Sequence, residues 1–194
     1  MYLYGASGHA KVIIDIIWSM GLPVDGIFDD NDALKTLCGI EVAHKWSGQS
    51  PIIISIGNNK IRKLIAERLG CEFGKAIHPS SVISTSVSID DGTVVMAGAI
   101  INAEANIGKN CIINTGASID HECVIGDFVH IAPHSTICGN VYVGEGSWVG
   151  AGATVLPGIK IGRWCTIGAG AVVIRDVADN TVVAGVPAKI IKYK

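Results

Sequence analysis

The sequence predicts a small α/β domain over residues 1–76, followed by a parallel β-helix over residues 77–194. In the first part, a glycine-rich turn joins an apolar strand to an amphipathic helix, which is typical of parallel α/β folds. In the second part, Ile or Val occupies every sixth position from Ile77 to Val173 without a break. Neither a helix nor an alternating strand has a period of six, whereas the sides of a β-helical coil do.

The α/β domain is expected to be a small Rossmann-like βαβ unit with parallel strands. After the glycine-rich turn at residues 5–9, Val12, Ile16 and Met20 recur at helical spacing, and Gly21 marks the end of that helix. The third strand is apolar throughout, so it is expected to be buried on both faces. The strands are expected at residues 2–4, 24–28 and 51–56, and the helices at residues 10–20 and 60–69.

The six-residue repeat predicts a triangular prism. Two residues before each large Ile or Val lies a small or β-branched residue, and alternation along a strand points both inward. Glycines recur every eighteen residues, so three repeats make one coil and these glycines stack at one corner, where glycine tolerates a positive φ. About five coils at roughly 4.8 Å each would stand about 25 Å tall. The stacked glycines are Gly108, Gly126, Gly144 and Gly162.

Composition excludes several classes of protein. The net charge is −2 and no basic run is present, so nucleic acid is not an expected partner. No run of eighteen apolar residues suggests a membrane span, and the first residues do not resemble a signal peptide. The six cysteines follow no metal-binding spacing, which favours a reduced, cytoplasmic protein without a metal.

Three polar turns follow the three predicted strands of the α/β domain. They are the glycine-rich turn with Ser7, Gly8 and His9, the pair Asp29-Asp30, and the turn that begins at Gly57. The carboxyl ends of parallel strands meet at one crevice, where α/β folds bind nucleotides. A nucleotide-type ligand is therefore favoured over the alternative of tight turns and a solvated acidic pair, although the full dinucleotide fingerprint is absent.

A histidine between two carboxylates, Asp120-His121-Glu122, is the main candidate for catalysis. His121 lies at a predicted corner, and its neighbours one coil away, Ala103 and Gly139, are small enough to leave room for a substrate. Histidine titrates near neutral pH and is the usual general base. Spacing alone does not say which carboxylate orients the ring, and a solvated corner is the alternative.

Two further histidines and a tryptophan interrupt the pattern of the prism. His130 faces outward on a flat side, and Trp148 lies one coil further in the same column, where it would be covered by a second subunit or line a ligand groove. His134 lies at a corner. A zinc site of His121, His130 and His134, as in β-helical carbonic anhydrases, is disfavoured because the three lie on different edges of the coil.

Several motifs together resemble bacterial nucleotide-sugar acetyltransferases of the hexapeptide-repeat, or left-handed β-helix, superfamily. The resemblance is strongest to the group of UDP-N-acetylbacillosamine N-acetyltransferases and sialic acid O-acetyltransferases. It spans nearly the whole chain and rests on residues 4–9, 29–30, 56–59, 114–115, 121–126 and 185–189. It departs from the family at His134, where glycine is frequent.

The resemblance implies the left hand of the coil, a homotrimer, and acetyl-CoA bound between neighbouring prisms. It implies that His121 is the general base and that Glu122 increases its basicity. Acetyl-CoA would contact His130 near the thioester and the backbone of Gly139, Ala151 and Ala169. The nucleotide of the sugar would be held by Ser7, Gly8, His9, Asp29, Asp30 and Gly57.

The expected reaction is therefore N-acetylation of the 4-amino group of a UDP-4-amino-4,6-dideoxy sugar, by direct transfer in a ternary complex. O-acetylation of a sialic acid and N-acetylation of GDP-perosamine are alternatives on the same scaffold. A non-catalytic structural β-helix is a remote alternative, because such a protein needs neither the polar turns nor the His121-Glu122 corner.

Overall fold

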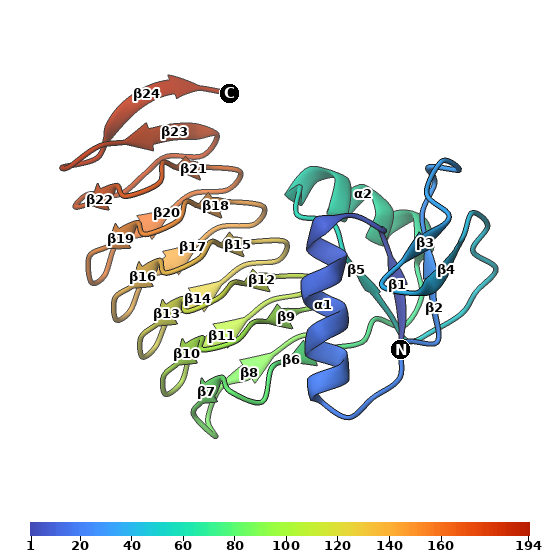
Figure 1. The fold of residues 1–194 in the computed structure, drawn as a ribbon. Coiled ribbons are helices and arrows are strands. Elements are labelled where there is room, and N and C mark those ends of the chain that lie inside the picture. The colour runs from blue at the N-terminus through green and yellow to red at the C-terminus, as the bar shows by residue number, and fades with distance from the viewer.

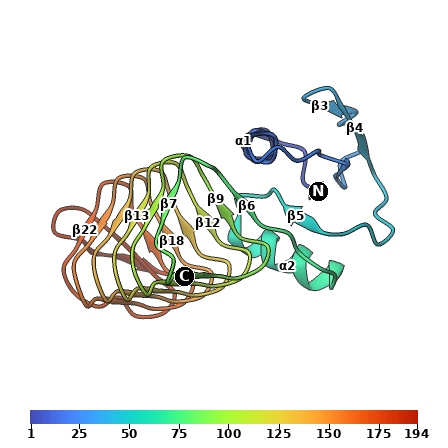
Figure 2. The same cartoon turned by 90° about the horizontal axis from the view of Figure 1, so that it is seen from below.

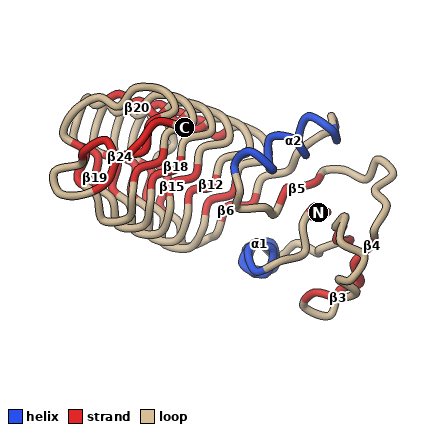
Figure 3. Tube along the Cα trace, turned by 90° about the horizontal axis from the view of Figure 1, so that it is seen from above, coloured by secondary structure: helices blue, strands red, loops and turns tan.

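The computed structural model describes residues 1–194 as an α/β domain beside a β-helical prism (Figure 1). No helix in it is both long enough and apolar enough to span a bilayer. Views from the two ends of the prism show α1 and α2 on the same side of it (Figures 2 and 3).

The α/β domain has a five-stranded sheet in the order β3-β4-β2-β1-β5, in which β1 pairs in parallel with both β2 and β5. The three expected strands and two expected helices are all present, and their ends differ by no more than about two residues. The elements are β1 (Tyr2–Tyr4), α1 (Gly8–Ser19), β2 (Gly26–Phe28), β3 (Thr36–Leu37), β4 (Ile40–Ala43), β5 (Ile52–Ile54) and α2 (Asn59–Leu69).

The hairpin of β3 and β4 was not predicted from the sequence. Its two-residue turn consists of Cys38 and Gly39, with φ angles of 49° and 78°. Two successive positive φ angles match the twist of a tight hairpin, but cysteine is not one of the residues that normally signal such a turn.

The prism consists of seventeen two-residue strands, each ending at or next to an inward Ile or Val. They form three parallel sheets in which each strand pairs with the one eighteen residues away, as in Ile101↔Ile119 and Ile119↔Ile137. The strands are β6 (Ala76–Ile77), β7 (Val82–Ile83), β8 (Ser88–Ile89), β9 (Val94–Val95), β10 (Ile100–Ile101), β11 (Asn106–Ile107), β12 (Ile112–Ile113), β13 (Ser118–Ile119), β14 (Val124–Ile125), β15 (His130–Ile131), β16 (Thr136–Ile137), β17 (Tyr142–Val143), β18 (Trp148–Val149), β19 (Thr154–Val155), β20 (Lys160–Ile161), β21 (Thr166–Ile167) and β22 (Val172–Val173).

The core of the prism is the predicted stack of large and small residues. Ile113, Ile131 and Val149 are fully buried on one face, and the small positions Cys111 and Ala117 are fully buried between such residues. After Val173 the six-residue register ends, as expected. The chain nevertheless adds β23 (Thr181–Ala184) in parallel beside β21 and β24 (Lys189–Tyr193) antiparallel at the edge, where only a turn and a short tail were expected.

The stacked glycines are required for a different reason from the predicted one. None of the four has a positive φ. A Cβ on Gly144 would instead lie 2.6 Å from the carbonyl carbon of Gly162 and 2.7 Å from the backbone nitrogen of Arg163 in the next coil. Positive φ angles occur at other turn positions, including the non-glycine residues Glu122 and His134. The corner glycines therefore allow close stacking of coils.

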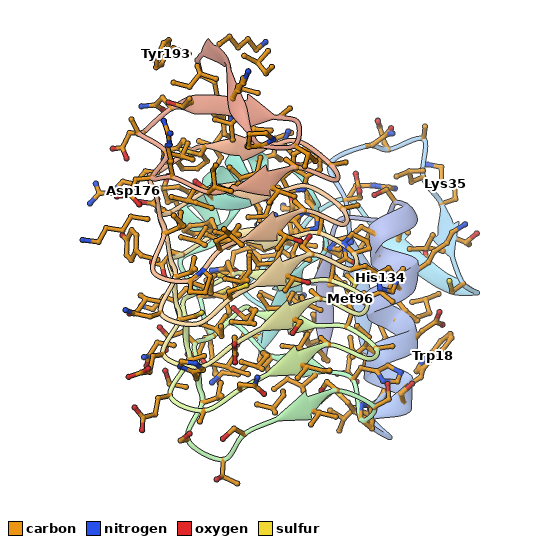
Figure 4. The ribbon with its side chains drawn as sticks, turned by 90° about the vertical axis from the view of Figure 1, so that its left-hand side faces the viewer. Trp18, Lys35, Met96, His134, Asp176 and Tyr193 are labelled. Carbon is orange, nitrogen blue, oxygen red and sulfur yellow. The ribbon has the colours of Figure 1, made fainter.

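One face of the prism, called here the domain face, carries the α/β domain. It consists of β6, β9, β12, β15, β18 and β21, extended by β23 and β24. Buried residues of α1 such as Ile13 pack in one cluster with Val94, Met96 and Ile112 of this face. Figure 4 shows Met96 beside α1, whereas Trp18 at the end of that helix points into solvent.

The close stacking of the glycines can be tested with a pair of variants. Gly144→Ala should lower the free energy of unfolding by about 2–3 kcal/mol, because the added Cβ overpacks against backbone. Gly158→Ala should cost only about 1–2 kcal/mol, because its positive φ is strained but no atom lies within 4 Å of the added Cβ. Urea unfolding of both variants measures the difference, and equal losses would contradict the stacking argument.

Candidate active site

The glycine-rich turn is held in place by the two neighbouring strands. Gly5 has a φ of 112°, and a Cβ there would lie 2.8 Å from Cγ1 of Ile56. Its N–H donates to the carbonyl of Phe28 at 2.7 Å, and its carbonyl accepts from the hydroxyl of Ser55 at 2.6 Å. α1 then begins at Gly8 with Ser7 at the N-cap, and the Ser7 side chain makes no capping hydrogen bond. This helix terminus therefore presents backbone N–H groups without a side-chain acceptor, which suits an anion.

The two acidic residues after β2 each make contacts within the domain. Asp29 accepts from the N–H of Ala6 at 2.7 Å with one oxygen and from the N–H of Asn31 at 2.9 Å with the other. Asp30 pairs with Arg68 at 3.0 Å and accepts from the hydroxyl of Tyr4. The hydrogen bond from Tyr4 is the main reason why the pKa of Asp30 is lowered. Asp29 thus fixes the first turn, and its role in nucleotide binding stays a prediction.

The turn at Gly57 is held by a buried arginine that the sequence reasoning missed. Arg62 of α2 is 1% exposed and donates to the carbonyls of Ile56 and Gly57 at 3.0 and 3.3 Å. The pattern of α2 contained a signal, since Asn59 and Arg62 share the inward stripe of Ile65 and Leu69. A polar residue on an apolar stripe indicates a buried hydrogen-bond network.

His130 lies on the domain face, outward as expected, but the α/β domain half-buries it. Its Nε2 is 3.0 Å from Nδ2 of Asn114, whose Oδ1 accepts the N–H of Thr115 at 2.8 Å. Because the amide nitrogen is a donor, Nε2 accepts and the neutral ring carries its proton on Nδ1. Burial first, and then the charge of Arg62, lower the pKa of His130 to about 3.

His9 lies close to the same place. Burial and the charge of Arg62 lower its pKa to about 4, and its Nε2 is buried without a hydrogen-bond partner. A cavity of about 510 Å³ opens beside His130, between α2 and the prism. It is lined by Gly57, Lys60, His130, Trp148, Trp164 and Lys194. Trp148 therefore lines a groove, one of the two outcomes expected for it.

The His121 corner lies on the prism edge opposite the domain face, between β13 and β14. Nδ1 of His121 is 3.0 Å from Oε2 of Glu122, and Oδ1 of Asp120 accepts the backbone N–H of His121 at 2.8 Å. Glu122 therefore contacts the ring, while Asp120 holds the turn. A Cβ on Gly139 would lie 2.7 Å from Nε2 of His121, so the glycine leaves that nitrogen accessible.

Within one chain, the expected site residues fall on three separate parts of the molecule. Gly8, His9, Gly57 and His130 lie where the domain meets the prism. His121, Glu122 and Gly139 lie on the opposite edge, and Ala151 and Ala169 lie in the turns that follow β18 and β21. The three histidines considered for zinc are not brought together, and no group of three or more His, Cys, Asp or Glu side chains is arranged to hold a metal.

Two family models match the two parts of the chain. Residues 1–69 match the PglD N-terminal domain, and residues 104–139 and 140–175 match the bacterial transferase hexapeptide (six repeats). Over 111 residues the chain is 42% identical to the UDP-N-acetylbacillosamine N-acetyltransferase of Bacillus subtilis, covering 48% of this chain and 49% of that protein. It thus spans about half the length of this curated relative. An uncharacterized protein L142 of Acanthamoeba polyphaga mimivirus also matches, with 36% identity over 21% of its length.

Solved structures match over nearly the whole chain. A mutant of the perosamine N-acetyltransferase from Caulobacter crescentus, in complex with CoA and GDP-perosamine, is 39% identical, with a TM-score of 0.94 and coverage of 98% of this chain and 96% of that chain. This chain belongs to the hexapeptide-repeat nucleotide-sugar acetyltransferases. The acetyltransferase domain of PglB from Neisseria gonorrhoeae, another such structure, is 35% identical with a TM-score of 0.91 and 98% coverage of both chains. The hexapeptide repeats of this family indicate a left-handed coil, as the sequence resemblance implied.

The two buried neutral histidines, His9 and His130, predict that the protein loses stability in acid. A free histidine has a pKa near 6.5, whereas the pKa values of His9 and His130 in the folded protein are about 4 and about 3. Below pH 6.5 the unfolded chain therefore binds protons at these positions that the folded protein does not bind. The contribution of the two histidines to the free energy of unfolding is complete above pH 6.5. It falls as the pH drops, by at most about 1.4 kcal/mol per pH unit for each histidine. Urea unfolding between pH 7 and 5 should show a steeper loss in the wild type than in a His9→Asn/His130→Asn variant. Equal slopes would show that these rings titrate normally in the folded protein.

Proposed function

We propose that the protein is an acetyl-CoA-dependent N-acetyltransferase that acts on the 4-amino group of a UDP-linked 4-amino-4,6-dideoxy sugar. The observation that carries this proposal is the pairing of His121 with Glu122 at 3.0 Å above the space left by Gly139. A ring held at Nδ1 by a carboxylate has its Nε2 free to accept a proton, which is the geometry of an oriented general base.

The chemistry follows from the residues. The amine of the sugar attacks the thioester carbonyl, and Nε2 of His121 takes the proton that the amine loses. The carbon–sulfur bond of the tetrahedral intermediate then breaks, the nitrogen keeps the acetyl group, and the CoA thiolate leaves and is protonated. Direct attack by the amine needs no cysteine nucleophile. Cys111, Cys123 and Cys165 are buried in the prism, and burial raises the pKa of Cys111 to about 12, so these thiols are poor nucleophiles.

The acetyl donor would lie along the prism. His130 would meet it near the thioester, and the backbone at Gly139, Ala151 and Ala169 would meet the pantetheine arm. Holding both substrates together for direct transfer would supply much of the rate.

The acceptor would be held by the α/β domain. Ser7, Gly8 and His9 form an uncapped helix terminus that suits the diphosphate of a nucleotide sugar, with Asp29, Asp30 and Gly57 around it.

The six cysteines are all free, which agrees with a protein of the cytoplasm, where thiols stay reduced.

A homotrimer would complete the site. In one chain, His121 lies on the edge opposite the domain face, so it does not reach an acceptor held by the turns of its own domain. A neighbouring prism that packs against the domain would bring its His121 to those turns. Each active site would then take its base from one subunit and its nucleotide turns from another.

GDP-perosamine is a second candidate acceptor. It is favoured by the Caulobacter crescentus enzyme solved with CoA and GDP-perosamine, which is 39% identical and matches 98% of this chain. The match to the Bacillus subtilis protein, in contrast, covers 48% of this chain.

Turnover with a panel of acceptors tests the reaction and the base together. Thiol release from acetyl-CoA is followed with UDP-amino sugars, GDP-perosamine and sialic acid. The UDP-amino sugar should be used best, and His121→Ala should lower kcat by about 10²–10⁴-fold because the base is lost. Glu122→Gln should keep part of the activity. Full turnover by His121→Ala would show that another group is the base, and preference for sialic acid would show O-acetylation.

Mixed subunits test the shared site. His121→Ala chains and chains with a bulky substitution at the nucleotide turn, Gly8→Trp, should each be inactive as pure proteins. Refolded or co-expressed together, they should regain activity, because some sites then combine an intact His121 with an intact turn. No recovery in mixtures that form hetero-oligomers, or a monomer at micromolar concentration, would contradict a site between subunits.

A further inference from the structure

Arg62 joins the nucleotide turn of the α/β domain to the prism. Besides the carbonyls of Ile56 and Gly57, its guanidinium donates to the carbonyl of Asn110 at 2.8 Å and to that of Phe128 at 2.9 Å. The last two carbonyls belong to corner turns of successive coils. A group with five donors in a fixed plane therefore sets the position of the Gly57 turn relative to two coils.

Asn59 extends the same contact by one coil. Its Oδ1 accepts from Nη2 of Arg62 at 2.9 Å, and its Nδ2 donates to the carbonyls of Gly146 and Ser147 at 3.0 and 3.1 Å. Arg62 and Asn59 together thus contact the turns that precede β12, β15 and β18. These three strands carry Ile112, His130 and Trp148 in one outward column.

His130 is two residues beyond the carbonyl of Phe128 that Arg62 holds. The charged and titratable groups that act on it are Arg62 of α2 and His9 of α1, while Asn114 fixes its Nε2 from the prism. No carboxylate contributes to the shift in its pKa. Burial is the main reason why the pKa of His130 is lowered, and the charge of Arg62 lowers it further. The same guanidinium sets the position of the Gly57 turn relative to the turn before His130.

We propose that Arg62 is a positioning residue for acetyl transfer, which fixes the nucleotide turn at Gly57 against His130 so that acceptor and thioester meet in reactive alignment. This inference rests on the proposed function, because it takes Gly57 as part of the acceptor site and His130 as part of the acetyl-CoA site. Arg62 acts through these two groups and touches neither substrate.

Lys63 provides a matched control on the same helix. It also crosses from α2 to the prism, where it pairs with the partly exposed Glu145 and its Nζ lies 5.9 Å from the centre of the Phe128 ring. Unlike Arg62, it makes no hydrogen bond to the backbone carbonyl of Gly57 or of Phe128. Removing it takes away an interdomain contact and leaves the alignment in place. Comparing Lys63 variants with Arg62 variants therefore separates the loss of an interdomain contact from the loss of a contact that positions the site.

The experiment compares the full-length wild type, Arg62→Met, Arg62→Lys and Lys63→Met as folded oligomers, with the acceptor that the wild type uses. Arg62→Met should lower kcat about tenfold or more, because misplacement of reacting groups costs rate even when both substrates bind. The KM for acetyl-CoA should stay within about twofold, and Lys63→Met should match the wild type in both constants. Arg62→Lys keeps the positive charge but lacks the planar set of donors, so its kcat should lie between those of the wild type and Arg62→Met. If Arg62→Met fails to assemble, Arg62→Lys is compared with the wild type in its place.

A spectroscopic readout accompanies the kinetics. ¹⁵N-histidine NMR at pH 6 should show the neutral Nδ1–H form of His130 in the wild type and in Lys63→Met, and shifted ring signals in Arg62→Met, because the ring is then held differently against the Gly57 turn. Unchanged kcat and an unchanged His130 signal in folded Arg62 variants would overturn the proposal, as would equal losses of kcat in Arg62→Met and Lys63→Met. If the wild type acetylates no acceptor in the panel, the proposed function itself is wrong and the role of Arg62 falls with it. If the wild type is active and the Arg62 variants have the same kcat and His130 signal as the wild type, only the positioning role of Arg62 is refuted.

Discussion

The buried positive charge of Arg62, which has no carboxylate partner, constrains how the α/β domain packs against the prism. Arg62 is 1% exposed, and burial lowers its pKa to about 10, yet it stays charged at neutral pH. Burying a charge is costly unless hydrogen bonds satisfy it. The acceptors available to Arg62 are backbone carbonyls of the Gly57 turn and of two prism corners, with the side chain of Asn59 beside them. A shift of the domain along the prism would leave several of these groups unsatisfied, so the charge selects one arrangement.

The regular prism makes that arrangement useful. Strands that repeat every eighteen residues place the corner carbonyls, the histidine of β15 and the tryptophan of β18 at fixed steps along one face. On the opposite edge the same repeat presents His121 above the space left by Gly139. Because α1 packs on the face through apolar residues and α2 through Arg62 and Asn59, the nucleotide turns are held by both kinds of contact. The scaffold thus supplies two half-sites with fixed geometry, which the proposed trimer would join.

The sequence predicted what depends on periodicity. The inward Ile and Val ladder, the three strands and two helices of the domain, and the corner position of His121 all follow from local patterns. It did not predict what depends on contacts between distant residues. Arg62 lies on the inward stripe of its helix, but the prism carbonyls that it binds are 48 and 66 residues away, and no local pattern brings them together. The hairpin turn at Cys38-Gly39 lacked a recognised turn residue at its first position. The stacked glycines are explained by the next coil and not by their own φ angles. The choice between Asp120 and Glu122 as the contact of the histidine ring likewise required the turn geometry around Glu122.

Amide hydrogen exchange of the full-length protein tests most directly whether the buried guanidinium joins domain and prism into one unit. The informative amides are that of Arg62, which bonds to the carbonyl of Asn58, and those of Asn110 and Phe128 in the prism corners. If Arg62 joins the domain and the prism into one unit, these amides exchange through the same opening, with equal free energies and the same denaturant dependence. Exchange of the first turn of α2 through a separate opening of much lower free energy, while the prism corners stay protected, would contradict it.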